Sequence, residues 1–285
     1  MRNKLFGIIG YPLEHSFSKA FFEQKFSEEG IENVLYKNFS IEKIDLLPAW
    51  LNKENNLCGF NVTIPYKEAV MPFLDSLSDI AKEVGAVNVV KIDRTKHGKL
   101  FLTGYNTDVY GFEKSLLEKT QCNSVFSQWF SVKQKDKITQ RCTEQTQRIT
   151  EKNVNSKQLS ALILGTGGAA KAVGYVLGKL NIDYQCVSRT FSKNTLSYEQ
   201  LDRHIIANNL LLINATPLGM FPDTTTYPPI DYTAIGKEHL LFDLVYNPAE
   251  TLFLKKGKEQ GANTQNGYEM LVYQAEEAWK IWNED

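Results

Sequence analysis

Along the first hundred residues, segments with the hydrophobic pattern of a strand alternate with segments that have the pattern of an amphipathic helix. Continuous apolar runs or a period of two residues predict strands at 4–10, 33–41, 58–64, 86–93 and 99–106. Amphipathic patterns between them predict helices at 18–30 and 41–54, and one or two helices at 67–85 that are interrupted at Pro72. This alternation indicates an α/β domain with a mixed sheet that is mostly parallel.

A second alternation of strands and helices begins at Ser160. It predicts strands at 160–165, 183–189, 210–216 and 239–246, and helices at 168–180 and 251–261. A final helix over 268–282 carries most of its apolar residues on one face, so it must pack against another part of the chain. The second half is therefore a further α/β domain.

The composition changes between the two halves. After a predicted helix at 109–120, residues 119–158 are rich in Lys, Gln, Thr and Asn, and 131–158 hold seven Lys or Arg against three Asp or Glu. A basic arm that binds a partner is one interpretation, and a solvated insertion, partly helical or disordered, is favoured over it. Its one apolar cluster, VFSQWF, would contact the body of the protein through Phe126, Trp129 and Phe130.

The totals exclude several classes of protein. The 285 residues, 42% of them hydrophobic, are enough for a sizeable core and about two domains. A net charge of −1 gives no long-range attraction to nucleic acid or acidic membranes, which favours a small ligand.

The four cysteines are widely spread without a C-x-x-C pair, so neither a metal site nor a disulfide framework is expected. We expect a cytoplasmic protein without a signal peptide or membrane span, either monomeric or homodimeric.

A glycine-rich turn joins the first strand of the second half to its helix. In LILGTGGAAKAV, Gly165, Gly167 and Ala170 have the G-x-G-x-x-A spacing at a strand–helix junction, which indicates a dinucleotide site. Gly165 would permit the tight turn, Gly167 the approach of a pyrophosphate, and Ala170 close packing of the helix, whose free N–H groups would face the anion. A glycine-rich turn without a ligand is the alternative.

The end of the next strand indicates which dinucleotide binds. An NAD site usually has Asp or Glu there, whereas this chain has Arg189, with Lys193 just beyond it. A guanidinium can bind a 2′-phosphate in a forked geometry, while a carboxylate would repel it. The sequence therefore favours NADP(H), and nicotinamide chemistry requires no metal.

Polar residues recur near the strand ends of the first half. They are Ser16, Ser18, Asn61, Thr63, Lys67, Asn88 and Asp108. Each alone has a structural explanation, such as a helix cap, a half-exposed strand position, a first-turn carboxylate or a surface lysine. Their recurrence where α/β sheets bind ligands indicates a small-molecule site.

Lys67 follows Pro65, and proline suits the first position of a helix. We therefore expect a helix to begin there and to place Lys67 in its first turn. The helix dipole would disfavour the ammonium form of the side chain and lower its pKa. Such a position is poor for stability but suited to proton chemistry, and a solvated surface lysine after a turn is the alternative.

The motifs resemble those of the shikimate dehydrogenase family along nearly the whole chain, apart from 119–158. In order they are GYPLEHSFS, GFNVTIPYK, GAVNVV, YNTDVYGF, GTGGAAKAV, SRT, NATPLGM, DLVYNP and NGYEMLVYQA. The resemblance implies reversible NADPH-dependent reduction of 3-dehydroshikimate to shikimate, in the pathway to aromatic amino acids. It also implies a substrate domain at 1–118 plus 268–285, an insertion or linker at 119–158 and a Rossmann-like NADP-binding domain at 159–267, with the last helix returning to the first domain.

The resemblance also implies roles for residues, motif by motif. Lys67 and Asp108 would be the catalytic pair. Ser16 and Ser18 would hold the substrate carboxylate, and the substrate's ring hydroxyls would contact Asn61, Thr63, Asn88 and Asp108, with Tyr246 and Gln274 completing the pocket. The cofactor residues would be Gly165, Thr166, Gly167, Gly168 and Ala169 at the pyrophosphate, Ser188, Arg189 and Thr190 at the adenosine phosphate, and Thr216, Leu244, Gly267 and Met270 near the nicotinamide, with Asp79 assigned by spacing.

Three departures from the family pattern are visible. Ser188 stands where Asn is usual, Val109 stands where Gly usually follows the NTD aspartate, and 119–158 is longer than the usual connection.

Two alternative functions remain open. One is a quinate or dual quinate/shikimate dehydrogenase, against which Arg189 argues. The other is a non-catalytic NADPH-binding regulator, against which the retention of both Lys67 and Asp108 argues.

Overall fold

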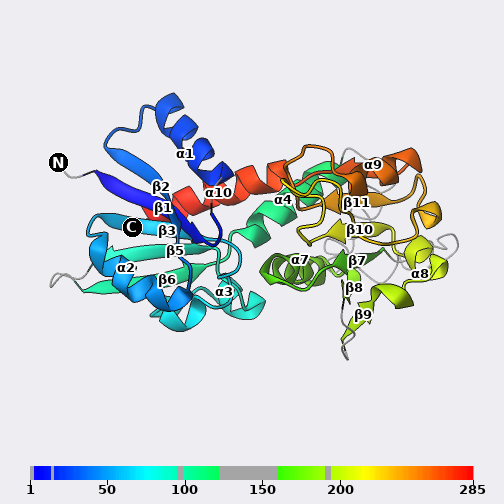
Figure 1. Ribbon diagram of the computed structural model, residues 1–285, viewed down its shortest axis with the longest axis horizontal. Coiled ribbons are helices and arrows are strands. Elements are labelled where there is room, and N and C mark those ends of the chain that lie inside the picture. Colours follow the sequence, from blue (N-terminus) through cyan, green and yellow to red (C-terminus); the bar gives the residue numbers. More distant parts are fainter. Residues whose placement is uncertain (1–2, 14–15, 95–98, 122–158, 190–193, 285) are drawn as a thin grey trace, which may run out of the picture. The chain divides into compact units, whose positions relative to one another are not determined.

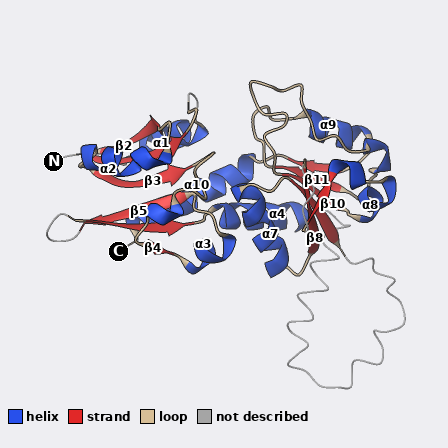
Figure 2. Cartoon of the chain, turned by 60° about the horizontal axis from the view of Figure 1, so that its bottom comes forward, coloured by secondary structure: helices blue, strands red, loops and turns tan. Residues whose placement is uncertain are grey.

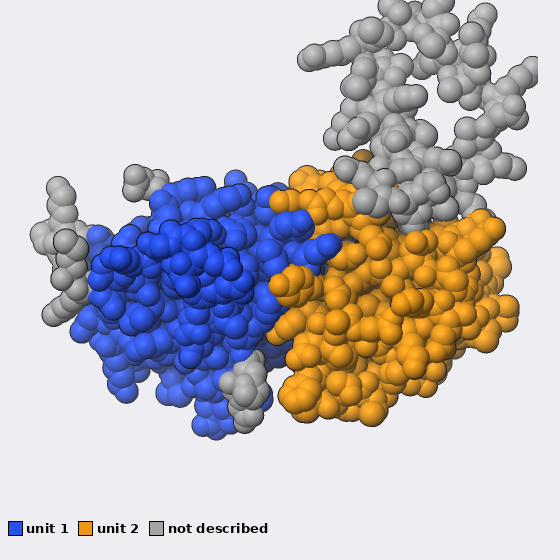
Figure 3. Space-filling view, turned by 90° about the horizontal axis from the view of Figure 1, so that it is seen from above, with its two compact units in different colours: residues 1–112, 167–176, 269–285 blue, residues 113–166, 177–268 orange. Residues whose placement is uncertain are grey.

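The computed structural model describes residues 3–13, 16–94, 99–121, 159–189 and 194–284 (Figure 1). The chain divides into two compact units, coloured separately in Figure 3. The first unit comprises residues 1–112, 167–176 and 269–285, and the second comprises 113–166 and 177–268. The structure contains two six-stranded sheets, which confirms the predicted α/β class.

The sheet of the first unit has the strand order β2-β1-β3-β5-β6-β4. Its strands are β1 (Lys4–Gly10), β2 (Val34–Ser40), β3 (Leu57–Val62), β4 (Ser76–Leu77), β5 (Val89–Arg94) and β6 (Leu100–Tyr105). Strand β1 is parallel to β2 and β3, and β4 is parallel to β6. Because β5 is antiparallel to β3 and β6, the sheet is mixed, as predicted.

Helices cover both faces of this sheet. The first are α1 (Phe17–Glu28), η1 (Ile44–Leu46), α2 (Leu47–Lys53), η2 (Met71–Phe73) and α3 (Asp79–Val84), followed after β6 by α4 (Asp108–Gln121). Phe6 of β1 packs in a cluster with Phe22 of α1, whereas Ile9 of β1 packs in another cluster with Leu47 of α2. Successive residues of a strand point to opposite faces of the sheet, so Phe6 and Ile9, three positions apart, lie on different faces. Helices α1 and α2 therefore cover different sides of the sheet.

The last helix, α10 (Tyr268–Asn283), belongs to the first unit except for its first residue, which confirms its predicted return. The indole Nε1 of Trp282 donates to the backbone oxygen of Val90 at 3.0 Å, and its ring stacks on Phe6 with centroids 4.8 Å apart. A Cβ added to Gly59 would collide with the Trp282 ring. Glycine on β3 therefore allows α10 to lie close to the sheet.

The sheet of the second unit is entirely parallel, with the order β12-β11-β10-β7-β8-β9. Its strands are β7 (Ser160–Leu164), β8 (Asp183–Ser188), β9 (Thr195–Ser197), β10 (Leu211–Asn214), β11 (Leu240–Asp243) and β12 (Asn263–Gln265). Its helices are α7 (Gly168–Lys179), η3 (Tyr198–Gln200), α8 (Arg203–Asn208), η4 (Tyr232–Ala234) and α9 (Leu252–Glu259), and Figure 2 shows α8 and α9 beside β10 and β11. Counted from β7, this is the doubly wound order 3-2-1-4-5-6 of dinucleotide-binding folds.

Within the described ranges, no helix is long and apolar enough to cross a membrane. The same ranges contain no group of three or more His, Cys, Asp or Glu that could hold a metal ion. Cys58 and Cys186 are free thiols. The predictions for 122–158, including its apolar cluster, lie outside the described residues.

Candidate active site

Lys67 and Asp108 form an ion pair in the first unit. The Nζ atom of Lys67 lies 2.6 Å from Oδ2 of Asp108. Lys67 lies in the turn that follows β3, and Asp108 is the first residue of α4. Their side chains are only 17% and 8% exposed. Because charge-assisted hydrogen bonds are short and strong, this pair fixes the ammonium group near the ends of the strands.

The helix predicted to begin at Pro65 is absent, so that prediction is wrong. Residues 64–70 form turns instead. The backbone of Lys67 is held in its turn because the N–H of Val87 donates to the carbonyl oxygen of Lys67 at 2.7 Å. The charge of Asp108, rather than a helix dipole, is therefore the main electrostatic influence on Lys67.

Asn88 connects this ion pair to α10. Its Nδ2 donates to Oδ1 of Asp108 at 2.9 Å and lies 3.4 Å from Oε1 of Gln274. Its Oδ1 accepts the backbone N–H of Thr107 at 2.7 Å. Asn88, Asp108 and Gln274 are all buried. Residues distant in sequence thus meet in one buried polar cluster.

Asn61, on β3, extends the cluster. Its Nδ2 donates to the backbone oxygen of Asn88 at 3.3 Å, and its Oδ1 accepts the hydroxyl of Tyr36 at 2.7 Å. Ser18 is buried on α1 and lies close enough to Tyr36 to oppose the rise that burial causes in the Tyr36 pKa. A line of hydrogen bonds therefore runs from Tyr36 through Asn61 and Asn88 to the ion pair.

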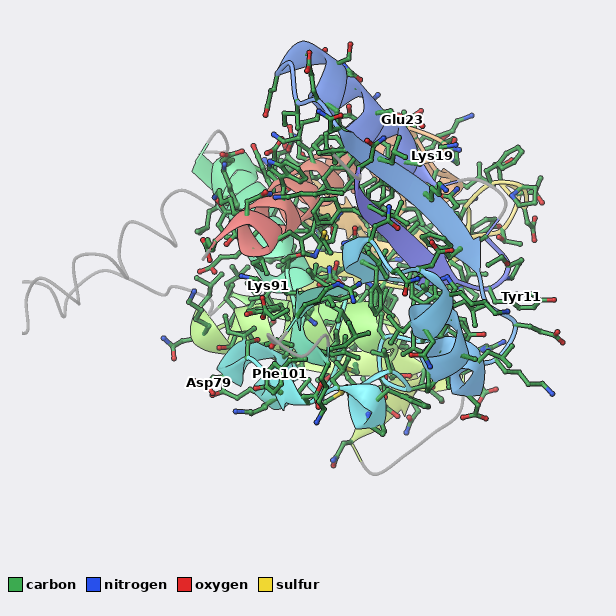
Figure 4. The ribbon with its side chains drawn as sticks, turned by 90° about the vertical axis from the view of Figure 1, so that its left-hand side faces the viewer. Tyr11, Lys19, Glu23, Asp79, Lys91 and Phe101 are labelled. Carbon is green, nitrogen blue, oxygen red and sulfur yellow. The ribbon has the colours of Figure 1, made fainter. Side chains whose placement is uncertain are left out.

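Three predicted residues of the first unit have no hydrogen bond to this cluster in the described part of the chain. Ser16 occupies the N-cap position of α1, but its side chain makes no capping hydrogen bond. Thr63 directly follows β3 and is half-buried. Asp79, labelled in Figure 4, begins α3 with a side chain that is 94% exposed and paired with Lys82 at 3.3 Å. Asp79 is thus a surface residue.

The start of α4 is shaped to hold Asp108. The Oδ1 atom of Asn106 accepts the N–H of Val109 at 3.3 Å, and its Nδ2 donates to the backbone oxygen of Ala86 at 2.9 Å. Val109 is buried here without a positive φ angle. The turn at Asp108 is therefore made although Val109 replaces the expected glycine.

Helices α4 and α10 approach each other at Gly111. A Cβ on Gly111 would collide with the backbone oxygen of Met270 and would lie 3.1 Å from Cβ of Gln274. Met270, predicted to lie near the nicotinamide, is buried in the first turn of α10. Gly111 thus sets the distance between the helices that carry Asp108 and Gln274.

The glycine-rich turn connects β7 to α7. Gly165 has a φ of +117°, and a Cβ there would lie 3.0 Å from the backbone oxygen of Ala215, so glycine is required. Thr166 and Gly167 are exposed, and no atom lies within 4 Å of a Cβ built on Gly167. Helix α7 begins with Gly168 and Ala169 and has no acidic side chain in its first turn. Its unpaired N–H groups are suited to an anion.

Asp243 links the loops that follow β10 and β11. Its Oδ1 accepts from Nδ2 of Asn214 at 2.9 Å and from the N–H of Val245 at 3.0 Å, and its Oδ2 accepts the Thr251 hydroxyl at 2.5 Å. Burial raises the pKa of Asp243 to about 7, although these three hydrogen bonds oppose the shift. Asn214 in turn accepts the N–H and hydroxyl of Thr216 on its Oδ1, at 3.1 and 2.6 Å.

The other predicted residues of the second unit follow the same strand ends. Leu244 and Tyr246 come directly after β11, and a Cβ on Gly267 would collide with the carbonyl oxygen of Leu244. Strand β8 ends at Ser188, and Arg189 after it is exposed. Ligands of open parallel sheets bind beyond these carboxyl ends. The predictions for Thr190 and Lys193 lie outside the described residues.

Several residues of these networks were not predicted from the sequence. Asn106 and Thr107 stand beside Asp108 in YNTDVYGF, and Asn214 and Asp243 begin NATPLGM and DLVYNP. A polar residue at the end of an apolar strand was the available signal for them. Tyr36 carried no such signal, because an aromatic residue within a strand pattern is expected simply to pack in the hydrophobic core.

Comparisons with known proteins agree with this geometry. A family model described as the shikimate dehydrogenase substrate binding domain matches residues 8–90. The chain is 34% identical over 296 residues to a shikimate dehydrogenase (NADP(+)) of Methanococcus maripaludis, with 99% of this chain and 92% of the relative covered. The chain belongs to the shikimate dehydrogenase family.

Solved structures of the family have the same fold. A shikimate 5-dehydrogenase from Thermus thermophilus, in complex with NADP(H) and shikimate, matches with a TM-score of 0.74 and 26% identity, covering 99% of this chain and 94% of that one. A quinate dehydrogenase from Corynebacterium glutamicum, in complex with NAD, matches with a TM-score of 0.73, 26% identity and the same coverages. The fold alone therefore does not separate the two substrates.

Proposed function

We propose that this protein catalyses the reversible NADPH-dependent reduction of the ring ketone of 3-dehydroshikimate to shikimate, in the pathway to aromatic amino acids. The observation that carries the proposal is the partly buried Lys67–Asp108 ion pair, hydrogen-bonded through Asn88 to Gln274. A ketone reduction needs a proton donor beside polar groups that orient a hydroxylated ring. This cluster supplies both.

Lys67 acts as the proton donor. One of its three N–H bonds points to Asp108, which leaves two for the ketone oxygen. As hydride adds to the carbonyl carbon, the C=O electron pair moves to oxygen, and the ammonium stabilises that charge and donates a proton to it. Asp108 holds the amine in place, and the reverse reaction returns the proton to Lys67.

Asp108, Asn61, Asn88 and Gln274 orient the ring. Each carboxylate oxygen of Asp108 accepts one bond from the protein, from Lys67 or Asn88, and keeps a lone pair for a substrate hydroxyl. The substrate residues are completed by Ser16 and Ser18 at the carboxylate and by Thr63 and Tyr246. We assign the substrate to a domain of residues 1–118 plus 268–285.

The glycine-rich turn fits a dinucleotide. The open space at Gly167, the φ of Gly165 and the absence of acid from the first turn of α7 suit a pyrophosphate. When bound, NADPH supplies the hydride. Its contacts would be Gly165, Thr166, Gly167, Gly168 and Ala169 at the pyrophosphate, Ser188, Arg189 and Thr190 at the adenosine phosphate, and Thr216, Leu244, Gly267 and Met270 near the nicotinamide. Asp79, an exposed residue, is the least supported contact.

The exposed guanidinium of Arg189 at the end of β8 supports NADPH over NADH. We assign NADP to a domain of residues 159–267, with 119–158 as the insertion between the two domains. We assign the protein to the cytoplasm, as a monomer or homodimer.

The test is an assay of nicotinamide absorbance with purified protein. We expect NADPH formation from shikimate with NADP⁺, and at least tenfold less turnover from quinate with NAD⁺. Preference for quinate would favour the quinate dehydrogenase alternative. No turnover with either pair would favour a non-catalytic NADPH-binding regulator and would refute the proposal.

A further inference from the structure

Tyr36 brings one polar atom into an apolar cluster. Its ring on β2 is 3% exposed and stacks on Phe22 of α1, with the centroids 4.6 Å apart. The Trp282 ring of α10 is tilted against it, with the centroids 6.5 Å apart. The ring is thus held by packing, while the hydroxyl reaches across β1 to Oδ1 of Asn61 on β3 at 2.7 Å.

The direction of this hydrogen bond is fixed by Asn88. A backbone carbonyl can only accept, so the amide group of Asn61 must turn its Nδ2 towards the oxygen of Asn88. Its Oδ1 then faces Tyr36, and an amide oxygen can only accept. The Tyr36 hydroxyl must therefore donate, and it is the partner in the described structure that satisfies Oδ1 of Asn61.

We propose that Tyr36 is a positioning residue that locks the Asn61 amide in one orientation, so that Asn61 recognises one ring hydroxyl of the substrate. The proposal rests on the function proposed above. With Tyr36 and Asn88 in place, Asn61 keeps one N–H and one oxygen lone pair in fixed directions. A substrate hydroxyl can use both of them at once, donating to Oδ1 and accepting from Nδ2.

The protonation of Tyr36 agrees with this role. Burial raises the pKa of Tyr36 well above its usual value, with nearby Ser18 opposing the shift, so the hydroxyl keeps its proton and remains a donor to Asn61. Tyr36 thus combines a ring held by packing with a hydroxyl held as a donor.

The test compares Tyr36→Phe with Tyr232→Phe. The first removes the bond to Asn61. The second removes a hydroxyl that donates to the backbone oxygen of Pro228 at 3.0 Å in the second unit. For Tyr36→Phe we expect the KM for shikimate to rise about tenfold, kcat to change less than threefold and the KM for NADP⁺ to stay constant. Tyr232→Phe should leave all three unchanged.

Shikimate analogues that each lack one ring hydroxyl separate positioning from simple destabilisation. One analogue lacks the hydroxyl that Asn61 holds. For that analogue, Tyr36→Phe and the wild type should have equal KM values. A Tyr36→Phe variant with a lower melting temperature but an unchanged KM for shikimate would overturn the inference. An equal rise in KM for shikimate and every analogue would overturn it as well.

Calorimetric titration of the wild type with shikimate keeps this inference distinct from the proposed function. Binding without turnover would refute the proposed reaction, and the ratio of shikimate Kd values between Tyr36→Phe and the wild type would then decide the role of Tyr36. An absence of shikimate binding to the wild type would overturn both.

Discussion

Lys67 and Asp108 lie 41 positions apart in the sequence, yet their side chains meet at 2.6 Å. The turn after β3 holds Lys67 through Val87, and the capped start of α4 holds Asp108 through Asn106. Neither charge depends on a flexible surface loop. Both arrangements also bond to the segment before β5, since Val87 holds Lys67 and Ala86 accepts from Asn106, so one stretch of backbone helps to fix the proton donor beside the carboxylate.

Replacing Asp108 with Asn should lower kcat for shikimate oxidation by about 10²-fold. The amide cannot neutralise Lys67, and it has a single oxygen where the carboxylate accepts both Lys67 and Asn88. Steady-state kinetics with shikimate and NADP⁺ measures the effect. The exposed Asp223→Asn serves as control and should have the wild-type kcat. A kcat for Asp108→Asn within twofold of the wild type would contradict the role of Asp108.

Replacing Arg189 with Ala should raise the KM for NADPH by about 10- to 100-fold, since hydrogen bonds to charged groups are worth roughly this factor. NADH turnover should change little, because NADH lacks the 2′-phosphate. The control is Arg203→Ala, which removes another exposed arginine, one that bonds Thr233 in the second unit. Equal losses with NADPH and NADH would refute the phosphate contact.

The parts of the fold that follow from long apolar patterns were predicted from the sequence. Strands β1 and β7 and helix α10 match their predicted ranges closely because burial imposes their periods. Strand β12 was missed because Asn263, Thr264 and Gln265 have no apolar pattern and pair only with β11, at the edge of the sheet. Its strand conformation comes from hydrogen bonding to its neighbour, which no local sequence signal records.

The helix predicted at Pro65 fails for a related reason. The preference of proline for a helix start is local, whereas Tyr66 and Val70 are both buried in the core cluster of the first unit. Tyr66 also donates its hydroxyl to the backbone oxygen of Ile41 at 2.5 Å. These tertiary contacts hold 64–70 as turns. Asn88 and Gln274 were named as candidates by motif, but their contact joins positions 186 apart, which only the fold reveals.

Asp243 should make the stability of the protein depend on pH. Its pKa is raised to about 7 from an ordinary value of 3.8, so the folded state binds a proton more tightly than the unfolded state. The free energy of unfolding should therefore fall between about pH 4 and pH 7, by at most roughly 4 kcal/mol, and then level off. Burial raises the pKa of Tyr232 far above this range, and Asp243 adds to that rise, so Tyr232 does not titrate here.

Urea unfolding at a series of pH values measures this dependence. Asp243→Asn should flatten it, because an amide can accept from Asn214 and donate to Thr251 without titrating. The exposed Asp231→Asn should keep the decline between pH 4 and pH 7. An identical decline in wild type and Asp243→Asn would show that other groups cause it.

Replacing Gly111 with Ala should destabilise the protein by about 1–3 kcal/mol, because the added methyl collides with the backbone of α10. It should also raise the KM for shikimate, since Gln274 must move. Gly178→Ala is the matched control: it lies in α7 with no atom within 4 Å of the new Cβ, so stability should stay equal or rise. Thermal unfolding of both variants measures the difference. Equal melting temperatures would contradict the close approach of α4 and α10.

The central claim is that Lys67 donates the proton to the reduced ketone. Measurement of kcat for shikimate oxidation by the wild type and by Lys67→Ala, at a temperature where both are folded, tests it most directly. The account predicts a loss of roughly 10²–10⁴-fold, the range for a general acid–base group. A Lys67→Ala variant with a kcat within about twofold of the wild type would contradict it.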